Sequence, residues 1–221
     1  MAGLPEAPTA SQPDCGDVFQ WLELASIHHA DKLAVVDRGR DATSTYSQLH
    51  RESAALAFWL DKQGIGRGDA IAVHCRNSAA VMRIHFAAAA LHAVVVNLNI
   101  NLASRELKYI LDDSRAKLVF VDQGVGASLV EASGDLPLVF IDVDGSSSVP
   151  QAIISKGTPF DGLLSEMGPL PVAEGASMED VFHLYYTSGT TGNPKPVELR
   201  YVDGPCALSR IDWLSAGGLT I

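Results

Sequence analysis

The stretch Ala93-Val-Val-Val-Asn-Leu-Asn-Ile-Asn-Leu-Ala-Ser-Arg-Glu-Leu-Lys-Tyr-Ile-Leu-Asp-Asp-Ser-Arg-Ala-Lys-Leu-Val-Phe-Val121 decides the fold class. Two apolar runs, 93–98 and 117–121, flank a segment at 104–113 whose apolar residues recur at helical spacing. Apolar runs without polar alternation are typical of strands that are buried on both faces. The order strand, helix, strand therefore predicts parallel strands that are joined by a crossover helix.

The same alternation continues on both sides of this stretch and predicts an α/β fold, a mostly parallel sheet flanked by helices. The other expected elements are a helix at 18–30 capped by Asp17, a strand at 33–36 with a hairpin partner at 43–46, a helix capped by Ser47 and ended by Gly64, a strand at 70–75, a helix at 78–91, a short helix after 121, a strand at 138–142 and a short helix near 163–167.

Composition excludes several classes of protein. The 221 residues are 47% hydrophobic, which is enough for a folded core, and they carry a net charge of −10. Such an acidic chain is a poor match for nucleic acid or for an anionic membrane surface, because both attract clustered Lys and Arg. No apolar run reaches the ~20 residues that a membrane-spanning helix needs.

The cysteines and the first residues suggest a compartment. The three cysteines are far apart and show neither a disulfide framework nor zinc spacing, so we expect a reduced, intracellular protein without a metal site. Residues 1–14 lack the basic and apolar regions of a signal peptide, and we expect residues 1–16 to be a disordered tail.

One segment combines glycines, hydroxyls and a lysine. Tyr185-Tyr-Thr-Ser-Gly-Thr-Thr-Gly-Asn-Pro-Lys195 follows the apolar residues 181–184. Glycines allow close backbone approach, and hydroxyls with a lysine can donate to phosphate oxygens. Loops of this composition often only connect elements. A Walker A loop is disfavoured, because Pro194 and Pro196 stand where its second glycine and its Ser or Thr would be.

The histidines and one acidic pair allow simpler interpretations. His183 lies two residues before Tyr185, so its side chain either faces a ligand or packs against the sheet. The sequence leaves both possibilities open. The pair Glu179 and Asp180 is expected to be a solvated charge at the beginning of the strand.

Residues 186–195 resemble the phosphate loop of the AMP-forming, adenylate-forming superfamily, which includes acyl-CoA synthetases, with its pattern Y-T-S-G-[ST]-T-G-x-P-K. Two upstream regions are also similar to that family. Residues 45–49 with 64–69 resemble T-Y-x-E-L and G-[VI]-x-x-G-D, and residues 93–114 resemble G-A-V-V-V-P-L-N followed by L, E-L-x-Y-I-L and D-S.

The resemblance implies a reaction and a site. The family joins a carboxylic acid to ATP to form an acyl-AMP, which CoA then converts to an acyl-CoA, and a fatty acid is the expected substrate. The resemblance implies ATP, Mg²⁺ and CoA as cofactors, a small carboxylic acid as partner, no nucleic acid, and a cytoplasmic or peroxisomal protein. It assigns no catalytic residue. The residues that it assigns to phosphate are Thr187, Ser188, Gly189, Thr190, Thr191, Gly192 and Lys195.

Departures from the family pattern predict how the chain is divided. Pro196 replaces a glycine, and residues 197–221 resemble no family element. We therefore expect 17–195 to be the N-terminal part of an AMP-binding domain without its C-terminal lid, and 196–221 to be divergent. Such a chain is expected to be truncated and inactive alone. The alternatives are a non-catalytic ATP- or anion-binding remnant and a non-functional product.

Overall fold

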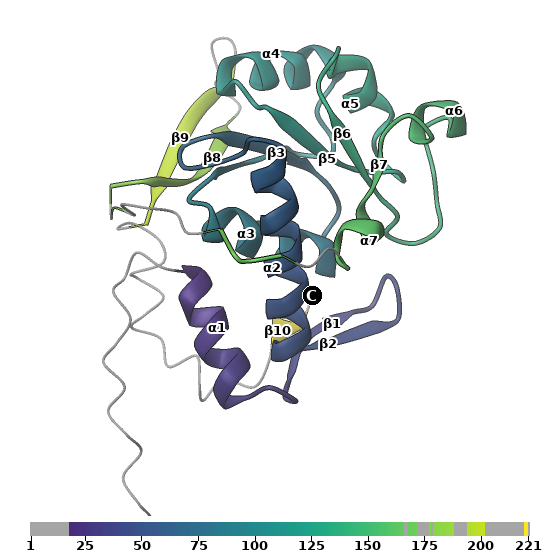
Figure 1. Cartoon of the computed structure of the whole chain (residues 1–221). Helices are drawn as coiled ribbons and strands as arrows, with labels where there is room; N and C mark the ends of the chain where they lie inside the picture. Colours follow the sequence, from purple (N-terminus) through teal and green to yellow (C-terminus); the bar gives the residue numbers. More distant parts are fainter. Residues whose placement is uncertain are drawn as a thin grey trace, which may run out of the picture.

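A seven-stranded sheet forms the centre of the protein (Figure 1). The computed structural model describes residues 18–165, 168–171, 177, 179–187, 194–201 and 219–220. Neighbouring strands are parallel except β8 and β9, which are antiparallel, and this confirms the predicted α/β class. The strand order is β7 (Thr158–Pro159), β6 (Leu138–Ile141), β5 (Leu118–Asp122), β3 (Ala70–His74), β4 (Val94–Asn97), β8 (Val181–Thr187) and β9 (Lys195–Arg200).

Helices cover both faces of the sheet (Figure 1). On one face α2 (Tyr46–Lys62) and α3 (Ala79–Ala90) share a core with Ile71 and Val73 of β3. On the other face α4 (Ser104–Ser114) and α5 (Ala127–Ala132) share a core with Ala70 and Ala72 of the same strand. Alternate residues of β3 thus face different helices, and all are buried, as the apolar runs predict.

The N-terminal elements form a smaller unit beside α2 and α3. Helix α1 (Val18–His28) contacts both helices, and β1 (Leu33–Asp37) and β2 (Ala42–Thr45) form the predicted hairpin. The strand β10 (Leu219–Thr220) pairs in parallel with β1. The predicted Asp17 cap and the tail at 1–16 lie outside the described residues.

Local differences from the sequence prediction occur at helix ends. Helix α2 is capped by Thr45 rather than by Ser47, so the predicted cap is wrong. The Thr45 hydroxyl accepts from the Gln48 N–H at 3.3 Å, and the Gln48 side chain accepts from the Thr45 N–H at 2.8 Å, which makes a capping box. At the other end Gly64, as predicted, follows the helix, with a φ of +76° that favours glycine.

Two short helices lie near the β7 edge of the sheet (Figure 1). They are α6 (Gln151–Ile154), which the sequence did not predict, and α7 (Phe160–Leu163). Helix α7 ends where the helix expected near 163–167 was to begin, and residues 166–167 lie outside the described part of the chain. None of the described helices combines the length and the apolar character that crossing a membrane requires.

Candidate functional site

The glycine- and hydroxyl-rich segment begins in β8 and ends in β9, and its described ends lie at the carboxyl end of the parallel strands β4 and β8. Thr187 is the last residue of β8, and Lys195 is the first residue of β9. The two are directly opposed in the antiparallel ladder. Of the predicted site residues, the structure brings together these two, and the other five, Ser188, Gly189, Thr190, Thr191 and Gly192, lie outside the described residues.

The side chains of Thr187 and Lys195, at the two ends of the segment, can both bind an oxyanion. Thr187 and Lys195 are both exposed. Among the described residues no carboxylate forms an ion pair with Lys195. A hydroxyl and an ammonium group on opposed residues are both hydrogen-bond donors, and charged donors make the stronger bonds to phosphate. This end of the β8–β9 hairpin can therefore bind phosphate oxygens.

A β-bulge in β8 sets which side chains face α3. The register with β9 shifts between Val181 and His183, so Phe182 is an extra residue in β8. The Phe182 and His183 rings consequently stack on the same side, with centroids 4.0 Å apart. Beyond the bulge the alternation resumes, and Tyr185 and Thr187 follow His183 on the α3 side.

His183 packs in the interior and also makes a polar contact. Its side chain is 8% exposed, and burial together with the nearby His85 lowers the pKa of His183 to about 3. The Tyr185 hydroxyl lies 3.2 Å from Nδ1 of His183. On the opposite face the Tyr186 hydroxyl donates to Asp113 at 2.7 Å. Of the two possibilities that the sequence left open for His183, the structure shows packing in the interior.

The residues just before β8 are anchored by ion pairs. Asp180 accepts from Nε of Arg67 at 2.9 Å and from Nη2 at 2.7 Å, and it also accepts from the Ser177 N–H. The prediction of a solvated pair is therefore wrong for Asp180, because Arg67 in the turn before β3 reaches it. Glu179 is exposed, as expected, and pairs with Arg200 of β9.

Another ion-pair network occupies the place where open α/β sheets commonly bind ligands. That place is the carboxyl end of two adjacent strands whose connections leave in opposite directions, which here are β3 and β5. Nε of Arg76 donates to the fully buried Asp122 at 2.6 Å, and Nη1 donates to Asp144 at 2.7 Å. A Cβ at Gly124 would lie 2.2 Å from Nη2 of Arg76. The guanidinium therefore packs directly against the backbone of Gly124 at this end of the sheet.

These three network residues were not predicted from the sequence. The signal was present, because Arg76 and Asp122 come directly after the strands predicted at 70–75 and 117–121, and the carboxyl ends of parallel strands meet at one edge. Asp144 has a pKa well below its usual range, because Arg76 and Ser146 donate hydrogen bonds to its carboxylate. The network is held together by charge and stabilises this edge of the sheet.

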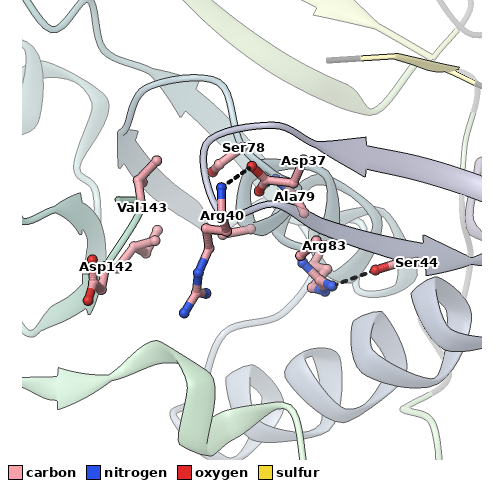
Figure 2. Close-up of a pocket in the computed structure, with 11 residues that line it drawn as sticks. Asp37, Arg40, Ser44, Ser78, Ala79, Arg83, Asp142 and Val143 are labelled. Atoms are coloured by element: carbon pink, nitrogen blue, oxygen red, sulfur yellow. Dashed lines mark hydrogen bonds between the residues drawn. The ribbon is translucent and has the colours of Figure 1, made fainter. Parts of the chain in front are cut away.

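A pocket of about 80 Å³ lies between the β1–β2 hairpin and the start of α3 (Figure 2). Its charged groups already have partners. Asp37 accepts from the Ala79 N–H at 2.8 Å, and Arg83 donates to Glu52 and to Ser44. Arg40 forms an ion pair with Asp161 at 2.9 Å. The lining of the pocket includes none of the predicted site residues, and we assign the pocket no ligand.

Comparisons with known proteins agree with this geometry. The family model described as "AMP-binding enzyme" matches residues 22–207. The chain is 35% identical to acyl-CoA ligase SID4 of Ajellomyces capsulatus, over 79% of this chain, and 28% identical to 3-oxocholest-4-en-26-oate–CoA ligase of Rhodococcus rhodochrous, over 78%. The aligned region amounts to 31% of the length of each of these two ligases.

A solved structure shows the same likeness in three dimensions. The anthranilate CoA ligase AuaEII, in complex with anthranoyl-AMP, is 25% identical and superposes with a TM-score of 0.71. The match covers 84% of this chain and 35% of that ligase. The resemblance drawn from residues 45–69, 93–114 and 186–195 is confirmed, and the chain belongs to the AMP-binding enzyme family.

Proposed function

We propose that the chain binds the phosphates of ATP between Thr187 and Lys195, within the activation of a carboxylic acid as an acyl adenylate. The observation that carries this proposal is the opposed pair of Thr187 and Lys195 at the carboxyl end of β8. Family membership supports it, because the relatives named above are CoA ligases and one of them is seen with an acyl-AMP.

The proposed reaction has two steps that fit this donor set. A carboxylate oxygen attacks the α-phosphorus of ATP, and the bond between that phosphorus and pyrophosphate breaks. The thiol of CoA then attacks the acyl carbon, loses its proton, and displaces AMP. Lys195 and Thr187 would bind the departing pyrophosphate and stabilise its negative charge. We propose the same role for the hydroxyls of Ser188, Thr190 and Thr191 and for the backbone at Gly189 and Gly192.

Further positive charge on the phosphates would come from Mg²⁺ bound with ATP. The exposed hydroxyl of Thr187 and the exposed ammonium group of Lys195 would contact the phosphates of such a complex. We assign none of the described residues to CoA or to the adenine ring.

The proposal for the acid substrate has a general form and a more specific form. A small carboxylic acid is the general proposal, and a fatty acid is the more specific one. The relatives act on chemically diverse acids by their names, including a sterol carboxylate and anthranilate. Release of pyrophosphate on addition of acetate, octanoate, palmitate or benzoate, each with Mg·ATP, tests both levels. Release with the fatty acids alone supports the specific proposal, and release with benzoate alone contradicts it.

A Lys195→Ala substitution tests the binding site directly. We expect the dissociation constant of Mg·ATP, measured by isothermal titration calorimetry, to rise about tenfold, because one charge-assisted hydrogen bond is lost. Lys195→Arg is expected to retain most of the affinity. The matched control is Lys108→Ala, an exposed lysine on α4 that pairs with Asp112. Equal losses in the Lys195 and Lys108 variants would contradict the assignment.

The same experiment distinguishes an enzyme from a binding module. Mg·ATP binding that depends on Lys195, together with acid-dependent pyrophosphate release, supports the ligase. Mg·ATP binding that depends on Lys195, with no pyrophosphate release on addition of any of the acids, would favour the non-catalytic ATP-binding remnant.

A further inference from the structure

His183 and Tyr185 form a polar pair that the proposed phosphate contacts do not use. The Tyr185 hydroxyl lies 3.2 Å from Nδ1 of His183. Tyr185 is 41% exposed, whereas His183 is 8% exposed, so the pair runs from the interior to the surface. The bulge at Phe182 places both side chains on the face of β8 that also carries Thr187. The exposed end of the pair therefore lies beside a described flank of the predicted site.

His85 of α3 holds the buried end of the pair. Nδ1 of His85 lies 2.7 Å from the Val81 carbonyl, which can only accept, so this nitrogen carries the proton. The Asn97 side chain also hydrogen-bonds to the His85 ring. The His85 and His183 rings meet edge to face with centroids 4.9 Å apart, and Phe182 stacks on His183 at 4.0 Å. These contacts fix the orientation of the His183 ring.

The environment of His183 favours one tautomer. Its low pKa makes the imidazole neutral at physiological pH, so the ring carries a single N–H. Its Nε2 is buried and has no hydrogen-bond partner among the described atoms. A buried N–H without an acceptor is rarer in folded proteins than an acceptor without a donor, which favours the proton on Nδ1. That nitrogen then donates to the Tyr185 oxygen, and the Tyr185 O–H is left to donate elsewhere.

We propose that Tyr185 contacts the ligand, with its hydroxyl donating to an anionic oxygen of the nucleotide bound between Thr187 and Lys195, and that His183 positions that hydroxyl. The inference rests on the proposed function, because a phosphate oxygen is the acceptor that this donor would meet. Tyr185 and Thr187 lie on the same face of the strand, about 6.6 Å apart, so a polyphosphate that contacts Thr187 can extend along this face toward the Tyr185 hydroxyl. His183 is a positioning residue in this scheme.

Removal of the Tyr185 hydroxyl tests its proposed contact with the nucleotide. We expect Tyr185→Phe to raise the dissociation constant of Mg·ATP about tenfold in isothermal titration calorimetry, since one hydrogen bond to a charged group is lost. The matched control is Tyr186→Phe, which removes the same hydroxyl from the next residue, on the opposite face, where it donates to Asp113. Binding by Tyr186→Phe is expected to stay within twofold of wild type. A Tyr185→Phe variant that also stays within twofold would overturn the inference.

Two substitutions of His183 test the positioning role. Asparagine places its amide near the position of Nδ1, whereas glutamine places its amide near Nε2. We expect His183→Asn to stay within about threefold of wild-type affinity and His183→Gln to lose about as much as Tyr185→Phe. A merely structural role would not separate the two amides, so equal affinities in these variants would overturn the positioning role.

The outcomes also separate this inference from the proposed function. A wild-type chain that binds no Mg·ATP contradicts both. Wild-type binding that weakens with Lys195→Ala but not with Tyr185→Phe leaves the proposed function intact and overturns the contact from Tyr185.

Discussion

An Arg76→Ala variant is expected to lose about 3–5 kcal/mol of unfolding free energy, because Asp122 would remain buried and charged without its partner. Asp122 is fully buried and accepts from Nε and Nη2 of Arg76 at 2.6 and 3.0 Å. Asp144 would also lose both of its hydrogen bonds from the guanidinium. Urea unfolding of the full chain, followed by circular dichroism, measures the loss.

The chain contains a matched control for this experiment. Arg40 makes a comparable two-bonded pair with Asp161, but the two side chains are 38% and 56% exposed. Exposed pairs contribute at most about 1 kcal/mol, so Arg40→Ala is expected to have a small effect. A double variant with Arg76→Met and Asp122→Leu is expected to recover much of the loss, since it removes the buried charge. Equal effects of Arg76→Ala and Arg40→Ala would contradict the account of Arg76 and Asp122 as a buried ion pair.

Acid is expected to destabilise the protein, with His183 as a major contributor. The pKa of His183 is about 3 in the folded protein, against about 6.5 in the unfolded chain. Between these values the unfolded state binds a proton that the folded state does not, so the stability is fully present above pH 6.5 and declines as the pH falls toward 3. A full pH unit in this window is worth at most about 1.4 kcal/mol, so the loss between pH 6.5 and pH 4.5 is about 2–3 kcal/mol.

Other histidines act in the same direction. Burial lowers the pKa values of His50, His74 and His85, so their contributions are also lost on acidification. The share of His183 is isolated by urea unfolding of wild type and His183→Asn at pH 7 and pH 4.5. We expect the difference between the two pH values to shrink by about 2–3 kcal/mol in the variant. A difference that is unchanged would mean that His183 is protonated in the folded protein.

The elements that could be predicted from the sequence are those with a strong local pattern. The strands β4, β5 and β6 are apolar runs buried on both faces, and α4 carries apolar residues at helical spacing, so each was found within one or two residues. The strand β7 has two residues, which is too short for any periodicity. The strand β9 carries Pro196 among charged residues and forms because β8 offers it a ladder, which is a tertiary effect.

The candidate site could be predicted only in part, for a similar reason. Residues 187–195 carried a recognisable order of glycines, hydroxyls and a lysine, and the structure brings its two ends together. The bulge at Phe182 has no sequence signal, since an apolar residue followed by His183 also fits a regular strand. The contact of His85 with His183 joins residues far apart in the chain, which only the packing of α3 on the sheet brings together. The division of the chain after residue 195 stays a prediction.

The place where ATP binds is tested most directly by nuclear magnetic resonance. In a titration of the isotope-labelled chain with Mg·ATP, we expect the largest changes in amide chemical shift at Thr187 and Lys195, with smaller changes at Tyr185. The amides that surround Arg76 and those that line the pocket of Asp37 and Arg83 are expected to remain unchanged. Changes concentrated at Arg76 or at that pocket, with Thr187 and Lys195 unaffected, would contradict phosphate binding at the end of the β8–β9 hairpin.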